Sequence, residues 1–201
     1  MNNYPIATIL GGGGFIGRYL VRNLTKKNFR CIVPTRNPFA KGYLKTQAPP
    51  GAIEIIDFNS KNFNEIKNAI NNSDVVINLT GILYETRKQK FNTIHEDLPE
   101  TIANLCAQSD VKKFVHVSAI GASKESKSKY QQSKFLGEEK SLNSFKNTIV
   151  IRPSVVCGSE DNFTNLFAKL SFSPIIPVLN MNYKFQPIFV NDVARAILKA
   201  I

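Results

Sequence analysis

Two polar side chains past the middle of the chain have the spacing of an acid–base pair. Tyr130 and Lys134 stand four residues apart in a segment with helical character, so they are expected on one face of a helix. A lysine ammonium beside a phenol stabilises the phenolate and lowers the pKa of the tyrosine, which can then act as an acid or a base near neutral pH. Ser118, at the end of an apolar run, is placed to hydrogen-bond the same substrate oxygen. These three are the catalytic candidates, although a Tyr-x-x-x-Lys spacing also occurs on ordinary surface helices.

A glycine-rich turn near the N-terminus gives this pair a context. Gly11, Gly14 and Gly17 follow the apolar run Ile6–Leu10 and open an amphipathic stretch. In a strand-to-helix turn of this spacing, one glycine allows a positive φ, a second lets the backbone approach a pyrophosphate, and a third lets the helix pack on the strand. The free N–H groups at the helix start attract the phosphates. A glycine-rich loop without a ligand is the alternative, but the strand before and the helix after favour nucleotide binding.

The residue after the second expected strand indicates which dinucleotide fits. An acidic residue there would bond to the ribose 2′-hydroxyl of NAD and repel a 2′-phosphate. This chain has Arg36 instead, 19 residues beyond Gly17. Because a guanidinium can hold a phosphate through two hydrogen bonds, we predict NADP(H), with NAD(H) as the alternative cofactor. The alternative role for Arg36 is that of a solvated surface cation.

Short apolar runs and helical patterns alternate along the chain and must position these residues. Strands are expected at 6–10, 31–33, 53–57, 75–79, 114–118 and 149–151, and helices from the glycine turn to about 28, at about 62–70, 98–108 and 128–142, and from about 192. This alternation predicts an α/β fold, a Rossmann-like doubly wound parallel sheet with helices on both faces. The strands lack in–out alternation, as expected when both faces are covered.

Ligands of such sheets bind at the carboxyl ends of the strands. This rule extends the candidate site beyond the glycine turn and Arg36 to the other strand ends, which carry Asp57, Thr80, Gly81, Ser118 and Pro153.

Composition and net charge indicate the size of the domain and the kinds of partner that the protein could bind. The 201 residues are 43% hydrophobic, which suits one globular domain spanning 1–201, and they carry a net charge of +11. Such a charge fits an anionic membrane surface or nucleic acid, but the lysines are scattered and no basic helix or aromatic platform is evident, so nucleic acid is not favoured.

Cysteine and histidine usage indicates compartment and chemistry. Cys31, Cys106 and Cys157 are odd in number and far apart, which fits a reduced cytoplasm. His95 and His116 do not lie in a cluster of potential ligands, so no metal site is predicted. We see no secretory signal and no apolar run long enough to span a bilayer.

Together these motifs resemble the short-chain dehydrogenase/reductase superfamily, in its extended or atypical branch. The resemblance covers nearly the whole chain. Within that superfamily the chain is most similar to the group that contains the NAD(P)H-binding accessory subunit of respiratory complex I and its bacterial relatives. The stretches that carry this narrower resemblance are Gly14–Leu20, Val33–Arg36, Val76–Arg87, Lys113–Ile120, Ser126–Tyr130 and Gln186–Val190.

The resemblance implies a tightly held NADPH. It implies that the pyrophosphate is surrounded by Gly11, Gly14, Phe15, Ile16 and Gly17. In the adenine half, it implies that Arg36 faces the 2′-phosphate and Asp57 the adenine, while Thr80 and Gly81 border the ribose. In the nicotinamide half, it implies that Tyr130 and Lys134 contact the ribose and Pro153 the nicotinamide. It also implies a structural cofactor in an accessory or assembly-type protein of complex I, or a protein linked to ubiquinone. The expected location is cytoplasmic, or peripheral on the inner face of the respiratory membrane.

Two departures from the superfamily pattern bear on activity. Ser118 lies only 12 residues before Tyr130, closer than in typical active members. Relatives also run longer, and their C-terminal part builds the substrate pocket, so residues 151–201 are expected to be the start of a small, incomplete C-terminal substrate region. The chain is then either a fragment or is completed by a partner. Both departures favour a cofactor-holding role, whereas the intact Tyr130/Lys134 pair favours an active NADP(H)-dependent reductase, dehydratase or sugar-nucleotide epimerase.

Overall fold

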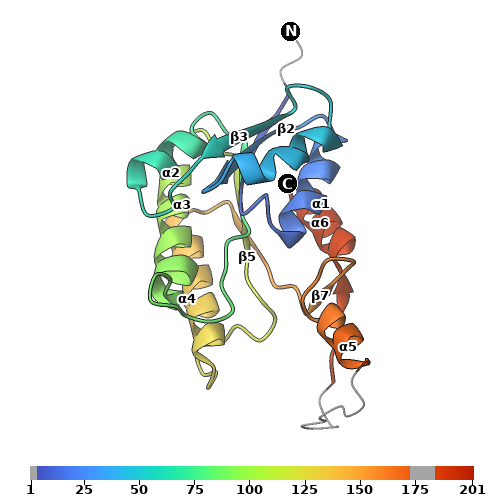
Figure 1. The fold of residues 1–201 in the computed structure, drawn as a ribbon. Helices are drawn as coiled ribbons and strands as arrows, with labels where there is room; N and C mark the ends of the chain where they lie inside the picture. The colour runs from blue at the N-terminus through green and yellow to red at the C-terminus, as the bar shows by residue number, and fades with distance from the viewer. Residues whose placement is uncertain (1–3, 173–183) are drawn as a thin grey trace.

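The computed structural model describes residues 4–172 and 184–201, and a parallel sheet runs through the centre of the described part (Figure 1). The strands lie in the order β3-β2-β1-β4-β5-β6. Their bounds are β1 Ile6–Leu10, β2 Arg30–Thr35, β3 Ile53–Asp57, β4 Val75–Asn78, β5 Lys113–Val117 and β6 Thr148–Ile151. The predicted strands are confirmed, with ends that differ by at most one residue at the N-terminal side and two at the C-terminal side.

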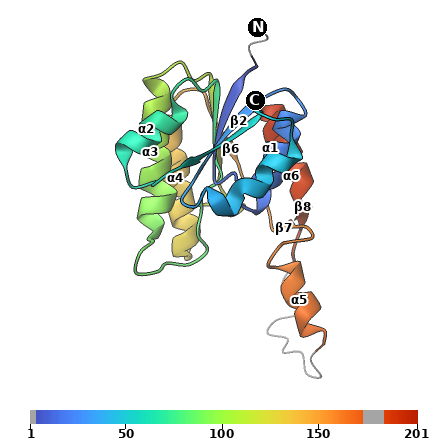
Figure 2. The same cartoon turned by 45° about the horizontal axis from the view of Figure 1, so that its top comes forward.

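Helices cover both faces of the sheet (Figures 1 and 2). On one face lie α1 (Phe15–Thr25) and α6 (Val190–Ala200), and on the other lie α2 (Phe63–Ile70), α3 (Leu98–Ala107) and α4 (Lys129–Ser144). Alternate residues of β1 serve the two layers, because Ala7 and Ile9 pack with α1 and α6 whereas Leu10 packs with α2 and α3. The doubly wound fold predicted from the strand–helix alternation is confirmed.

The strand order reverses at β1, which pairs with β2 on one side and β4 on the other. Leu10 is in register with Asn78, so the glycine turn and the segment Leu79–Gly81 leave the same edge of the sheet side by side. Such a switch point opens a crevice at the carboxyl ends of the strands. The topology therefore brings together residues that are about 70 positions apart in sequence.

Asparagines lie near the ends of two of the helices. Asn28 adopts a left-handed conformation (φ 61°) where the sequence placed the end of the first helix, but α1 already ends at Thr25, with Lys26 as its C-cap. Asn62 caps α2, since its Oδ1 accepts a hydrogen bond from the Asn64 backbone N–H at 3.1 Å. Glu65 bonds the Asn59 N–H rather than that of Asn62, so the cap differs from a full capping box.

Several short elements were not predicted. They are the 3₁₀-helix η1 (Phe39–Gln47), the π-helical turn η2 (Asn92–Asp97), the strand β7 (Val156–Cys157) and the helix α5 (Thr164–Leu170). β7 pairs with β8 (Ile188–Phe189) in a separate two-stranded sheet, which lies between α6 and α5 (Figure 2) and packs against α6. These elements escape sequence patterns because they are short or depart from the 3.6-residue period.

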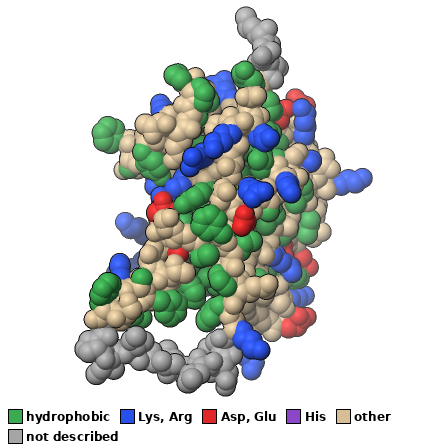
Figure 3. All heavy atoms as spheres, turned by 90° about the vertical axis from the view of Figure 1, so that its right-hand side faces the viewer, with side chains coloured by type: hydrophobic (Ala, Val, Ile, Leu, Met, Phe, Trp, Pro, Cys, Tyr) green, Lys and Arg blue, Asp and Glu red, His purple; other side chains and the backbone are tan. Residues whose placement is uncertain are grey.

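On one face of the molecule, basic side chains are spread rather than concentrated (Figure 3). On the face shown in Figure 3, Lys and Arg side chains lie from edge to edge with hydrophobic side chains between them. Within residues 4–172 and 184–201, no helix is both long and apolar enough to cross a bilayer.

Candidate functional site

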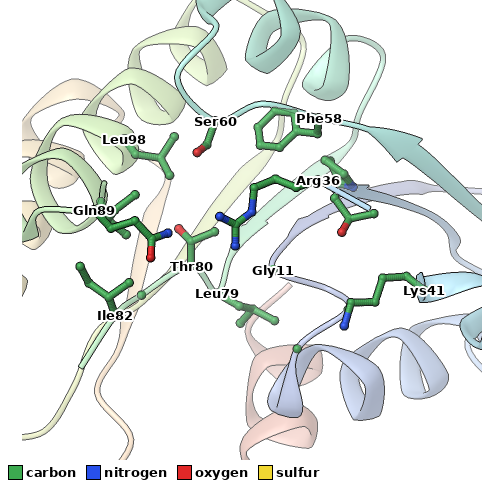
Figure 4. A pocket seen from close by; sticks show the side chains of 16 residues that line it. Gly11, Arg36, Lys41, Phe58, Ser60, Leu79, Thr80, Ile82, Gln89 and Leu98 are labelled. Atoms are coloured by element: carbon green, nitrogen blue, oxygen red, sulfur yellow. The ribbon is translucent and has the colours of Figure 1, made fainter. Parts of the chain in front are cut away.

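A cavity of ≈ 360 Å³ opens at the switch point (Figure 4). Its walls come from the loops after four strands, β1 to β4. Besides the loop after β3, they include Gly11 and Gly14 after β1, Arg36 after β2, and Thr80 and Gly81 after β4. These are five of the residues that the sequence analysis placed in a nucleotide site.

The glycine turn has the geometry that a pyrophosphate cradle requires. Gly11 has a φ of +81°, and a Cβ on Gly17 would lie 2.5 Å from the Gly11 carbonyl oxygen, so both positions need glycine. Gly14 is the N-cap of α1, and neither a capping side chain nor an acidic residue occupies the first turn of this fully described helix. The N–H groups there are free for an anion, and the residues present fit a dinucleotide.

Two basic side chains flank this cradle. Arg36 extends across the cavity toward Thr80, and Lys41 lies on the side of the glycine turn (Figure 4). Lys41 belongs to η1 and packs its methylene groups against Gly13, and Tyr43 of the same helix donates a hydrogen bond to the Gly13 carbonyl oxygen at 3.3 Å. Lys41 was missed at the sequence level because η1 has no clear periodic signal.

In the loop after β3, the side chains that line the cavity are not the one expected from the sequence. Asp57 was expected to face the adenine, but its side chain is exposed, it accepts a hydrogen bond from the Phe58 N–H at 3.0 Å, and it does not line the cavity. Phe58 and Ser60 line the cavity instead. The strand-end rule found the correct loop but not the side chains, because the loop turns directly after β3.

Six other expected cofactor contacts also lie outside the cavity wall, namely Phe15, Ile16, Gly17, Tyr130, Lys134 and Pro153. Phe15 and Ile16 start α1, and the Phe15 ring packs edge-on against Tyr19 with ring centroids 6.2 Å apart. Their backbone N–H groups, rather than their side chains, belong to the anion cradle. Pro153 follows β6, and its carbonyl oxygen accepts a hydrogen bond from the Ile120 N–H at 2.9 Å.

Lys134 lies beside the cavity. A Cβ on Gly81 would be 4.0 Å from Lys134 Nζ, and that ammonium donates a hydrogen bond to the Val117 carbonyl oxygen at 2.8 Å. Burial lowers the pKa of Lys134 to about 8, while the nearby Glu138 carboxylate opposes this shift. A buried ammonium next to the cavity is suited to bind hydroxyl oxygens.

Tyr130 differs from expectation in its ionisation. The sequence predicted that Lys134 lowers the pKa of this phenol, but in the structure burial raises the pKa of Tyr130. The prediction of a lowered pKa is wrong because the ring packs edge-on against Phe91 and His95, at 5.9 and 5.4 Å between centroids, which removes water from around it. Ser118 is also buried, and its Oγ has no partner among the residues described.

A buried polar pair below the cavity was not anticipated. Asn78, the last residue of β4, donates through Nδ2 to Nδ1 of His116 at 3.3 Å and accepts the Thr80 N–H on Oδ1 at 3.0 Å. Burial lowers the pKa of His116 to about 3, with smaller contributions from Lys134 and His95, so the imidazole is neutral. Asn78 thereby fixes the backbone of Thr80 at the cavity wall.

Comparison with known sequences gives this site a family. The sequence profile of the NAD dependent epimerase/dehydratase family matches residues 7–201. NADH dehydrogenase [ubiquinone] 1 alpha subcomplex subunit 9, mitochondrial, is 34% identical over 97% of this chain in Mus musculus and 36% identical over 98% in Dictyostelium discoideum. Ceramide reductase from Caulobacter vibrioides is 25% identical over 96% of the chain. The chain spans about half the length of the complex I subunits that it matches, 52% and 55% of the two proteins.

Solved structures share the fold. Pen from Bacillus thuringiensis superposes with a TM-score of 0.84 at 17% identity, covering 98% of this chain and 66% of that one. MoeE5 in complex with UDP-glucose and NAD gives a TM-score of 0.77 at 18% identity, covering 96% and 71%. With the glycine cradle and the full-length family match, these findings establish that the chain belongs to the NAD dependent epimerase/dehydratase family, whose cofactor is a nicotinamide dinucleotide.

Proposed function

We propose that this chain holds NADPH as a structural cofactor and acts as an accessory or assembly-type protein of respiratory complex I, located peripherally at the respiratory membrane. Similarity to complex I subunits over nearly the whole chain supports the partner. It also supports the location, since those relatives are named as mitochondrial subunits of an NADH:ubiquinone oxidoreductase.

The basic wall of the cavity is the observation that carries the cofactor choice. Arg36 and Lys41 line it, and among the described residues no aspartate or glutamate does. NAD-binding sites of this fold use an acidic side chain for the ribose 2′-hydroxyl, whereas a guanidinium can take a 2′-phosphate through two hydrogen bonds. The cavity walls therefore favour NADPH over NADH.

The environment of Tyr130 and Lys134 supports binding without turnover. The phenol is half-buried against two rings and its pKa is raised by burial, so it remains a protonated hydrogen-bond donor at neutral pH. Lys134 donates to a backbone carbonyl of β5. Both groups are suited to hold ribose hydroxyls.

The test is to denature the purified protein and identify the released nucleotide by chromatography. NADPH near one molecule per chain is the expected result, and recovery of NADH, or of no adenine dinucleotide after incubation with NADPH, contradicts the proposal. Native membranes resolved by size should show the protein co-migrating with complex I. Migration at its own mass in every membrane preparation contradicts the assignment of the partner.

An active NADP(H)-dependent reductase, dehydratase or sugar-nucleotide epimerase is the second candidate. The intact spacing of Tyr130 and Lys134 on α4, with Lys134 beside Gly81, favours it. The bound nicotinamide supplies hydride transfer in such reactions. Steady oxidation of NADPH with a quinone, a carbonyl compound or a sugar nucleotide would select this candidate over a structural cofactor.

A further inference from the structure

His95 lies at the junction of the segments that surround the cavity, although nothing in its sequence context marked it as part of the site. It is 1% exposed and sits in η2, the π-helical turn that leads into α3. A π-helical turn is uncommon and often occurs at functional positions because it displaces side chains from the ordinary helical register. Here it directs the His95 imidazole toward the segment after β4 and the N-terminal part of α4.

Both ring nitrogens are engaged, and their partners fix the tautomer. Nε2 lies 3.0 Å from the Ile82 backbone nitrogen, which can only donate, so Nε2 carries no proton. Nδ1 therefore carries the proton and donates to Ser133 Oγ at 2.8 Å. Ser133 in turn donates its hydroxyl proton to the Tyr130 carbonyl oxygen at 2.8 Å. The result is a series of hydrogen bonds, in which each residue donates to the next, that runs from the cavity wall after β4 to the first turn of α4.

The faces of the same ring make further contacts. It stacks on Phe91 with centroids 5.2 Å apart at 20°, and it meets Tyr130 edge-on at 5.4 Å. A Cβ on Gly81 would lie 3.7 Å from Nε2 and 4.0 Å from the Lys134 ammonium. The imidazole thus stands between the Gly81–Ile82 wall and the side chains proposed to contact the nicotinamide ribose.

Protonation of the His95 ring would break this series of hydrogen bonds, and the surroundings of the ring prevent protonation. Burial and, to a smaller extent, the Lys134 ammonium lower the pKa of His95 to about 4, while the bond from the Ile82 N–H acts in the opposite direction. The ring stays neutral around pH 7, and its acceptor nitrogen remains available to Ile82.

We infer that His95 is a positioning residue that holds the Gly81–Ile82 wall and Tyr130 in the geometry needed by the nicotinamide half of the dinucleotide. This inference rests on the proposed binding of a dinucleotide in the cavity. The adenine half, at Arg36 and Phe58 across the cavity, does not depend on the imidazole.

The experiment compares a whole dinucleotide with its adenine half. Calorimetric titrations measure Kd for NADPH and for 2′,5′-ADP, with NADH and ADP as the second pair, in wild type and variants. In His95→Asn the shorter side chain retains a polar group near Ser133 but does not reach the Ile82 N–H. We expect its Kd for NADPH to rise about tenfold, the range for loss of a buried hydrogen bond, with the Kd for 2′,5′-ADP unchanged within about twofold.

Two further variants separate positioning from general damage. In His95→Gln a carbonyl oxygen takes the place of Nε2, and the Kd for NADPH should return toward that of wild type. Asn92→Ala changes an exposed side chain of the same π-helical turn and should leave both Kd values unchanged. Equal weakening of both ligands in His95→Asn, failure of His95→Gln to rescue, or equal wild-type affinity for NADPH and 2′,5′-ADP would overturn the inference. A wild type that binds none of the four ligands would instead overturn the proposed function.

Discussion

Lys134 carries a charge that the fold buries at the edge of the cavity. Only 3% of the residue is exposed, and its ammonium donates to one backbone oxygen. Burial of an ammonium is unfavourable for folding, and the nearby Glu138 carboxylate offsets this only in part, so its presence fits a group retained for binding. Arg36 is exposed, so this argument does not extend to it, although its side chain lines the cavity.

For Lys134 the sign of the pH dependence follows from its lowered pKa. The unfolded chain holds the proton up to about pH 10.5 and the folded chain only to about pH 8, so the free energy of unfolding rises with pH between these values. Below pH 8 the full unfavourable contribution, roughly 3 kcal/mol, remains. We expect Lys134→Met to raise the free energy of unfolding at pH 7 by about 1–3 kcal/mol and to weaken dinucleotide binding. Urea denaturation at pH 7, with Lys129→Met on the exposed start of α4 as control, measures this; a stability loss specific to Lys134→Met would contradict it.

At the scale of one side chain, the proposed preference for NADPH depends on Arg36. Arg36→Asp removes a phosphate ligand and adds a charge that repels a 2′-phosphate, so the Kd for NADPH should rise about 10- to 100-fold while NADH binds at least as well. Titration of both cofactors checks this, with Lys45→Ala in η1, whose side chain is exposed, as a control. Equal affinities of the wild type for NADPH and NADH would show that Arg36 does not discriminate.

At the scale of elements, the site depends on close contact between helices. α4 packs against η2 and α3, and its Gly137 faces the backbone of η2 so closely that a Cβ would lie 1.7 Å from the His95 carbonyl oxygen. No rotamer change can relieve a clash between a Cβ and a backbone atom. The contact therefore sets the distance between the helix that carries Tyr130 and Lys134 and the turn that carries His95.

Gly137→Ala should therefore force the two elements apart and lower the free energy of unfolding by about 3 kcal/mol or more, or prevent folding. Gly42→Ala is the matched control, because nothing lies within 4 Å of its added Cβ and its φ is not positive. That variant should be neutral or more stable by up to about 1 kcal/mol. Thermal and urea unfolding of the two variants measure the difference, and similar stability of Gly137→Ala and wild type would contradict the packing argument.

At the scale of the whole molecule, two buried histidines make the free energy of unfolding depend on pH below about 6.5. Burial lowers the pKa of His95 to about 4 and of His116 to about 3, so from pH 6.5 downward the unfolded chain binds protons that the folded chain excludes. The free energy of unfolding should fall by up to about 1.4 kcal/mol per pH unit for each group as the pH decreases from 6.5 toward these values.

His116→Asn isolates one of these groups. The asparagine carbonyl oxygen can still accept from Asn78 where Nδ1 did, and the titrating ring is gone. Between pH 6.5 and 4, the slope of the unfolding free energy against pH should be shallower than that of wild type by up to about 1.4 kcal/mol per pH unit, the contribution of one proton. Urea denaturation across that range gives the slope, and an unchanged slope would show that His116 is protonated in the folded state.

Local chemistry explains what could be predicted from the sequence. Ile6–Leu10 and the three glycines of the turn indicated strand, turn and helix because only glycine tolerates the positive φ at Gly11 and the contact at Gly17. Since parallel strands end at one edge, the strand-end rule then identified Arg36, Thr80 and Gly81 as neighbours. Each of these inferences depends on periodicity or backbone conformation, which a sequence carries directly.

Only the tertiary structure decided which side chains face the cavity and how they ionise. Lys41 reaches the glycine turn through the unpredicted helix η1, and Phe58 replaces Asp57 because a loop turns after β3. The raised pKa of Tyr130 and the two bonds of His95 arise from rings and backbone groups brought together across η2, β4 and α4. Burial and hydrogen-bond direction depend on contacts between segments far apart in the chain, so they are set by packing and leave no mark on the local residue pattern.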